Sequence, residues 1–164
     1  MMLSFTIDSM RPKIEAGLRE RAVSGFPRPG DYSSTEDVKR QTIRFRGPVW
    51  QRVLAEAKNG IVERDLHLWW RSRTKNRERL GTVRGFGIEP VTISRYSDAI
   101  CAIHLASGSY SCAADGSLAV TRIDPVAAFA HAFARADGFD TFMDFVRFFV
   151  PRAGDRFCGA LIRW

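Results

Sequence analysis

The middle of the chain contains short segments in which apolar and polar residues alternate, and this pattern restricts the folds that it can adopt. In the segment 65–70, Leu66 and Leu68 fall on one face and His67 and Trp69 on the other. Around Gly108 and Gly116 the polar stretches indicate hairpin connections. We expect strands at residues 65–70, 81–84, 89–94, 99–105 and 118–122, and further strands at 3–7, 41–46 and 157–164.

Helices are expected before and after this strand-rich region. Asp8 or Ser9 can cap a first helix with Gly17 near its end, and residues 50–57 have the apolar spacing of an amphipathic helix. Asp124-Pro125 is a favourable start for a later helix. Asp140 can cap a last helix that ends at Pro151, whereas residues 21–38, rich in Gly, Pro and Ser, are typical of an exposed loop. Several short strands with two or three helices predict an α+β domain around a curved sheet or small β-barrel.

Length and charge narrow the functional classes. A chain of 164 residues favours a single domain, and its net charge of +7 favours an anionic partner such as nucleic acid, although many small basic proteins bind none. The three cysteines lack the spacing of a zinc site or a disulfide framework. We found no signal peptide and no apolar run of about 20 residues, so we expect a soluble, cytoplasmic protein with no membrane partner. The oligomeric state stays open, with a monomer favoured.

The hexapeptide Lys39-Arg40-Gln41-Thr42-Ile43-Arg44 is the first candidate site. Its cations are suited to phosphate or carboxylate, and Lys39 near Thr42 offers a base and a nucleophile. If Lys39 is desolvated near Arg40 or Arg44, its pKa falls and it can act as a base. The alternative is an ordinary solvated strand edge.

A second basic segment follows the tryptophan pair Trp69-Trp70. Alternation along a strand sends these two indoles to opposite faces, so that at most one packs inward and the other can lie near the cations. Arginine on phosphate with an aromatic ring under a base is a common way to hold single-stranded nucleic acid. A solvated loop with both indoles in the core is the alternative. The candidate binding residues here are Trp69, Trp70, Arg71, Arg73, Lys75 and Arg77.

Other chemistries have little support in the sequence. The histidines His67, His104 and His131 are scattered, and there is no HExxH motif or Cys/His cluster for a metal. Nucleophile-elbow, P-loop and dinucleotide-binding motifs are also missing, and the glycines at 81–87 lack the GxGxxG spacing. We therefore expect no metal and no cofactor.

Four fragments in order give the chain a family resemblance. They are a phenylalanine-containing strand with a helix ending at Gly17, the hexapeptide 39–44, the segment 134–139 (ARADGF) and the terminal segment 159–164 (GALIRW). Together they resemble the ASCH (activating signal cointegrator homology) domain, especially its small bacterial and phage-type members. The resemblance spans nearly the whole chain and implies a PUA-like fold, a small β-barrel of short mixed strands flanked by helices, associated with RNA binding.

The resemblance also implies catalytic residues. Some ASCH members are amidohydrolases that remove the acetyl group from acetylcytidine, using a lysine, a threonine three residues later and a carboxylate near the C-terminus; other relatives are ribonucleases. Lys39, Thr42 and Asp137 match these positions. The chain departs from the family in a loop insertion at 18–38 and in an aspartate where the amidohydrolases have glutamate. Lys39 can meet Thr42 only if the strand begins after Lys39 or contains a bulge.

These observations lead to one principal hypothesis and two alternatives. The principal one is an ASCH domain that binds RNA or a modified nucleoside beside residues 39–44 and, if it is an enzyme, hydrolyses an acyl amide on a modified cytosine. Lys39 would be the base and Thr42 the nucleophile, and Asp137 would exchange a proton with the base ring or the leaving nitrogen, while Arg44 would hold a phosphate or the base edge. The alternatives are a non-catalytic RNA-binding module and a metal-independent ribonuclease.

Overall fold

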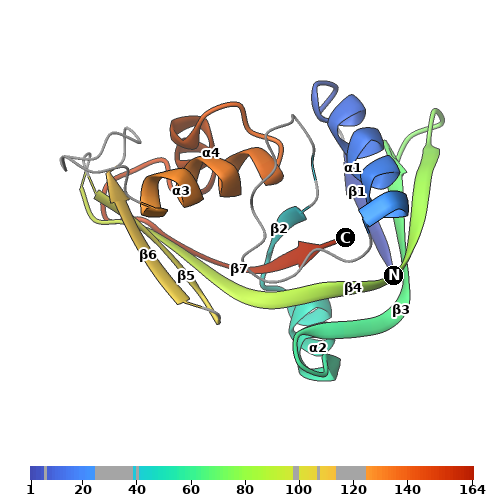
Figure 1. Cartoon of the computed structure of the whole chain (residues 1–164), viewed down its shortest axis with the longest axis horizontal. Helices are drawn as coiled ribbons and strands as arrows, with labels where there is room; N and C mark the ends of the chain where they lie inside the picture. Colours follow the sequence, from blue (N-terminus) through green and yellow to red (C-terminus); the bar gives the residue numbers. More distant parts are fainter. Residues whose placement is uncertain (6, 25–38, 40, 98–99, 107, 114–124) are drawn as a thin grey trace.

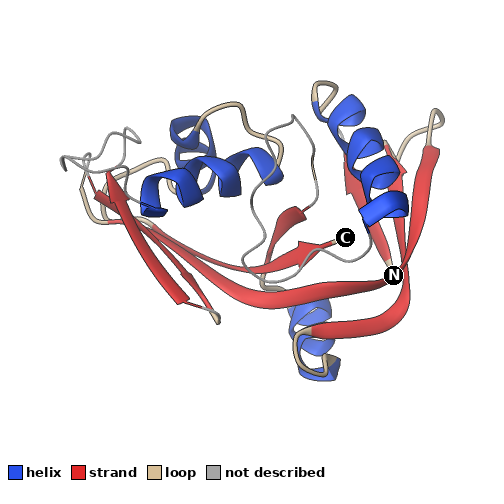
Figure 2. Ribbon diagram, viewed as in Figure 1, coloured by secondary structure: helices blue, strands red, loops and turns tan. Residues whose placement is uncertain are grey.

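The chain folds as a mixed α+β structure around one strongly curved sheet (Figures 1 and 2). The computed structural model describes residues 1–164 except 6, 25–38, 40, 98–99, 107 and 114–124. The described strands are β1 (Met2–Phe5), β2 (Gln41–Phe45), β3 (Ile61–Trp70), β4 (Glu78–Arg95), β5 (Ile100–Leu105), β6 (Gly108–Ala113) and β7 (Arg156–Arg163). The described helices are α1 (Met10–Ser24), α2 (Pro48–Glu56), α3 (Pro125–Ala136) and α4 (Phe142–Phe149).

The long strand β4 holds the sheet together. Its first half pairs with β3, and its second half pairs with both β5 and β7, all antiparallel. β6 extends the sheet beyond β5, β1 adds to β3 in parallel, and β2 pairs with β7. The sheet curls into a half-barrel, with α1, α3 and α4 on its concave side and α2 below its convex side (Figure 1). Figure 1 also shows the strand β2 between α1 and the α3–α4 pair.

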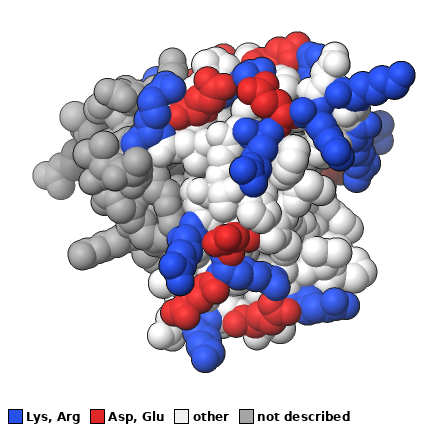
Figure 3. All heavy atoms as spheres, turned by 90° about the vertical axis from the view of Figure 1, so that its right-hand side faces the viewer, with Lys and Arg blue, Asp and Glu red and all other residues white. Residues whose placement is uncertain are grey.

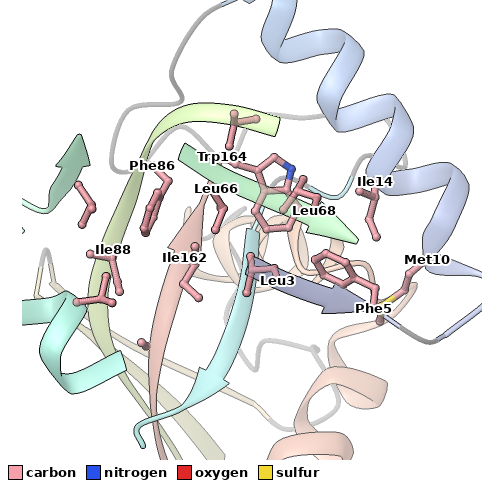
Figure 4. Close-up of a cluster of buried hydrophobic side chains, with 14 of the residues drawn as sticks. Leu3, Phe5, Met10, Ile14, Leu66, Leu68, Phe86, Ile88, Ile162 and Trp164 are labelled. Atoms are coloured by element: carbon pink, nitrogen blue, oxygen red, sulfur yellow. The ribbon is translucent and has the colours of Figure 1, made fainter. Parts of the chain in front are cut away.

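Two clusters of buried side chains fill this half-barrel. One lies between α3, α4 and the second half of β4, and includes Phe133, Phe145 and Leu161. The other lies between β1, α1, β3 and the end of the chain, where the indole of Trp164 packs among Leu68, Leu3 and Phe5 (Figure 4). Alternate residues of β7 belong to different clusters, so this strand is buried on both faces.

The predicted α+β class and curved sheet are confirmed, and a small barrel-like fold is consistent with the half-barrel. Within the strand 65–70, Leu66 and Leu68 are buried as the alternation predicts, although β3 begins earlier, at Ile61. The two strands predicted at 81–84 and 89–94 are parts of the single strand β4. Gly85 lies where the register between β3 and β4 shifts, and its φ of +71° lets the chain continue through this irregularity.

Three other predictions were wrong in detail. The first helix does not end near Gly17 but continues to Ser24, so the loop predicted from residue 21 begins later, and residues 18–24 of the predicted loop insertion are helical. Residues 108–113, predicted as part of a hairpin connection, form β6. Thr141 rather than Asp140 caps α4, because its hydroxyl accepts a hydrogen bond from the backbone N–H of Asp144. The strand predicted at 118–122 and the loop residues 25–38 lie outside the described residues.

None of the described helices is long and apolar enough to cross a membrane.

Candidate active site around Lys39 and Asp137

Lys39 lies just before β2, in the space between α1 and α3. The backbone N–H of Lys39 donates to the carbonyl of Lys13 in α1 at 2.9 Å, which fixes the chain before the strand begins at Gln41. The strand thus begins after Lys39, the first of the two arrangements that would let Lys39 approach the same face as Thr42. The Lys39 side chain is only 1% exposed, which is unusual for lysine.

Asp137 closes the C-terminal end of α3 in a Schellman turn. The N–H of Gly138 donates to the carbonyl of Arg135, and the N–H of Phe139 donates to that of Ala134. Gly138 has a φ of +94°, and a Cβ atom at this position would lie 3.2 Å from Cδ of Lys39. Glycine is therefore needed both for the turn and for the space that the lysine occupies.

The side chains of Lys39 and Asp137 form a buried ion pair. Lys39 Nζ lies 2.8 Å from Asp137 Oδ1 and also donates to the backbone carbonyl of Asp137. That carbonyl is at the C-terminal end of α3, where the helix dipole favours a cation. The backbone N–H of Ile43 in β2 is close enough to lower the pKa of the Asp137 carboxyl. The pair thus ties β2 directly to α3.

Burial shifts the pKa values of both partners toward their neutral forms. Desolvation lowers the pKa of Lys39 in spite of Asp137, and the positive charges of Arg44 and Lys13 lower it further. Desolvation raises the pKa of Asp137 in spite of Lys39 and Arg44. The difference in free energy between the charged pair and a neutral amine–carboxylic acid pair is therefore smaller than it would be in water.

A cavity of about 160 Å³ opens beside this pair. Thr42, the third predicted catalytic residue, is on its wall together with Lys39 and Asp137. The structure thus brings all three residues to one cavity. They come from two parts of the chain that are far apart in sequence, since 95 positions separate Thr42 from Asp137. The remaining lining residues are Ser4, Phe5, Ile7, Met10, Ile43, Arg44, Phe139, Phe148 and Phe149.

Arg44 supplies a second cation to the cavity. Its NH2 group donates to the carbonyl of Ser4 at 2.6 Å, and its guanidinium carbon lies 5.4 Å from the centre of the Phe5 ring. Burial lowers the pKa of Arg44, although it stays positively charged as an arginine. Its Nε is buried without a hydrogen-bond partner among the described residues, while the residue as a whole lines the cavity.

The tryptophan pair and the basic segment lie at a different place, at the turn between β3 and β4. Trp70 is buried and Trp69 is half-buried, as expected for one indole packing inward. Arg71 lies 5.8 Å from the Trp70 ring and pairs with Asp8 at 2.7 Å, whereas Arg73, Lys75 and Arg77 are exposed. None of these residues lines the cavity. Arg40 lies outside the described residues.

The β3–β4 turn nevertheless adjoins one wall of the cavity. The N–H of Arg71 donates to the carbonyl of Phe5, and the N–H of Ser72 donates to the hydroxyl of Ser4. Phe5 and Ser4 both line the cavity. On this side of the molecule, lysine and arginine side chains gather toward the upper end, with carboxylates among them (Figure 3).

Sequence reasoning missed the aromatic wall of the cavity. Phe139, Phe148 and Phe149 line it, and Phe148 is 60% exposed. The sequence places Phe142, Phe145 and Phe149 on the buried stripe of α4 and leaves Phe148 outside it. A large apolar residue on the polar face of a predicted amphipathic helix was the available signal.

No protein-family model matches the chain, and no curated protein or solved structure matches it significantly. Within the described part of the chain, no group of three or more His, Cys, Asp or Glu side chains is arranged to hold a metal ion. The site is therefore interpreted from its own geometry and from the motif resemblance.

We expect the buried pair to be strongly coupled in folding. Lys39→Met or Asp137→Asn alone should lower the free energy of unfolding by about 3–5 kcal/mol, because each leaves a buried charge without its partner. The double variant should lose less than the sum by about 0.5–3 kcal/mol. Urea denaturation of the four proteins of this cycle measures the coupling.

The pair Arg64–Glu56 is a matched control, because its charged atoms are 2.9 Å apart while both side chains are exposed, 41% and 44%. A cycle with Arg64→Met and Glu56→Gln should give a coupling below about 1 kcal/mol. Equal coupling in the two cycles, or strict additivity for Lys39 and Asp137, would contradict the buried ion pair.

Proposed function

We propose that this protein is an ASCH-type domain that binds a base of RNA or a modified nucleoside in the cavity and hydrolyses an acyl amide on it, with acetylcytidine as the model substrate. The observation that carries the proposal is the buried Lys39–Asp137 pair, which shares its cavity with Thr42. The resemblance of residues 39–44 and 134–139 to the ASCH motifs supports the choice of reaction. PUA-like architecture is part of the same proposal.

The two pKa shifts supply the acid and the base that amide hydrolysis needs. A lowered pKa of Lys39 makes the neutral amine accessible as a general base, and a raised pKa of Asp137 makes its carboxylic acid accessible as a proton donor. Proton transfer from Lys39 to Asp137 across the 2.8 Å contact generates both forms at once. Opposed environments of this kind are how enzymes assign acid and base roles near neutral pH.

The proposed reaction proceeds through an acyl-threonine. Lys39 takes the Thr42 hydroxyl proton while Oγ1 attacks the acyl carbon, and Asp137 gives its proton to the amide nitrogen as the carbon–nitrogen bond breaks. Water then attacks the acyl-threonine ester; one of its protons returns to Thr42 Oγ1 and the other leaves with the carboxylic acid, while the proton on Lys39 passes back to Asp137 within the pair. The sum is one amide and one water giving one carboxylic acid and one amine. The positive charge of Arg44, which lines the cavity, would stabilise the oxygen that becomes negative.

The size of the cavity favours a base over a whole nucleotide. Sites for drug-sized ligands measure about 300–1,000 Å³, whereas this cavity measures about 160 Å³. A modified base with its acyl group would enter, and the sugar and phosphate would remain at the rim.

A second candidate function is RNA binding without catalysis through the β3–β4 turn. Three exposed cations, Arg73, Lys75 and Arg77, lie in the turn that hydrogen-bonds to the cavity residues Ser4 and Phe5. Phosphates beside a base in the cavity would meet positive charge there. This candidate shares the binding surface of the first but needs no reaction at Thr42.

The decisive experiment uses the nucleophile. Thr42→Val removes the hydroxyl with little change of shape, so we expect acetate release from acetylcytidine to fall by about 10²–10⁴-fold, while Thr42→Ser, which keeps a hydroxyl, should retain part of the activity. Acetate is measured by chromatography in the presence of a chelator, with circular dichroism to show that each variant is folded. Wild-type protein that releases no acetate yet binds RNA would favour the binding module, and cleaved RNA would favour a ribonuclease.

The pH profile should report the charge around Lys39. The pair works with one shared proton, so kcat/KM should rise with pH as the doubly protonated pair loses its first proton, and should fall again when the second is lost. The charge of Lys13 lowers the pKa of Lys39, so Lys13→Gln should raise this pKa and move the rise to higher pH. Arg44→Gln should shift it further in the same direction, since Arg44 contributes more to the lowering, and Lys13→Arg should leave the profile in place. A shift to lower pH in Lys13→Gln would be incompatible with Lys39 as the base.

Salt dependence tests the β3–β4 turn. If Arg73, Lys75 and Arg77 each contact a phosphate, replacing all three with glutamine should reduce the slope of log K against log salt for single-stranded RNA by about 2. Filter binding across a range of potassium chloride concentrations measures the slope. An unchanged slope would show that the turn is ordinary solvated surface, and Arg19, Arg52 and Arg64 provide an exposed triple variant of equal charge as control.

A further inference from the structure

A continuous series of aromatic rings leads out of the cavity toward the end of β2. The Phe148 and Phe149 rings, both on the cavity wall, are 5.0 Å apart, and Phe149 is 4.9 Å from Phe157 of β7. Phe157 is in turn 6.3 Å from Phe45. We call Phe148, Phe149, Phe157 and Phe45 the aromatic strip.

The strip is exposed at both of its ends. Phe148 is 60% and Phe45 is 72% exposed, and Phe149 and Phe157 between them are half-buried. Gly159 pairs with Phe45 in the sheet, and a Cβ atom at Gly159 would lie 2.5 Å from the Phe157 ring. The glycine therefore lets Phe157 lie flat against β7 and continue the strip.

Arginines accompany the strip along the chain. Arg147 precedes Phe148, Arg156 precedes Phe157 and Arg46 follows Phe45, and all three arginines are exposed. The net charge of +7 favours an anionic ligand over an apolar protein segment on these rings. Exposed aromatic rings on a basic protein are an arrangement that holds the bases and phosphates of a single strand.

We propose that the aromatic strip binds the bases that adjoin the one in the cavity, so that the ligand is a single-stranded polynucleotide and not a free nucleoside. The inference rests on the proposed function in one respect, that the cavity takes a base. Because Phe148 and Phe149 belong to both cavity and strip, a strand can pass from one to the other without a break. Phe45 is the far end of this path.

The test compares a mononucleotide with a short strand. We expect a fluorescein-labelled cytidine hexanucleotide to bind more tightly than cytidine monophosphate, as measured by fluorescence anisotropy with the monophosphate as competitor. Phe45→Ala should weaken hexanucleotide binding about 5- to 150-fold, the range expected for one stacked base. It should leave the monophosphate unaffected. Phe45→Trp should retain binding, and Tyr96→Ala, which removes an aromatic ring that is 62% exposed at another turn, should have no effect.

Each outcome bears on the proposal. Equal affinity for the two ligands, or hexanucleotide binding unchanged in Phe45→Ala, would overturn it, as would sedimentation that shows a dimer which Phe45→Ala dissociates. Loss of binding in Phe45→Ala together with no acetate release by the wild type would support the strip and refute the hydrolase. Acetate release from the free nucleoside with no preference for the hexanucleotide would support the hydrolase and refute the strip.

Discussion

Removing two opposite charges from water is costly unless they meet with good geometry, and in this protein the contact of Lys39 with Asp137 meets that condition in the middle of the fold. Three elements converge to make it. The carbonyl of Lys13 in α1 holds the backbone of Lys39, the chain entering β2 carries the Lys39 amine, and the end of α3 presents Asp137 to it. If any one of these elements moved, a buried polar group would lose its partner in this contact. The pair therefore links the packing of the half-barrel to the shape of the cavity.

The local parts of this arrangement could be predicted from the sequence. Alternation in 41–44 places Thr42 and Arg44 on one face, and both line the cavity. The ADG sequence at 136–138 contains the glycine that a Schellman turn requires. The contact between Lys39 and Asp137, by contrast, spans 98 positions. No periodicity in the chain reports it, and only the motif resemblance suggested that these residues belong together.

The errors have a common physical origin. The break predicted between the strands 81–84 and 89–94, and the helix end predicted near Gly17, both fall at glycine, because glycine weakens both kinds of element when they are considered alone. In the folded chain, β4 continues through Gly85 because hydrogen bonds to β3 flank it on both sides, and α1 continues past Gly17, which is buried. Tertiary packing thus outweighs a local preference of about 1 kcal/mol per residue. The exposed Phe148 and Phe45 were missed for the opposite reason, since burial patterns identify a core but not the apolar residues left outside it.

The shortness of aspartate has a structural consequence for the proposed chemistry. Because Asp137 is at the very end of α3, its backbone carbonyl and its carboxylate both reach Lys39 Nζ, which holds the amine close to the helix end. The turn is closely packed around the lysine, since a Cβ atom at Gly138 would lie 3.2 Å from Lys39 Cδ and 3.4 Å from Met10 Cγ. The acid and the base are in direct contact at 2.8 Å, without an intervening water. In such an arrangement the proton needs to move only across one hydrogen bond, so the reactivity of the site depends on how well the two helices and β2 exclude water from it.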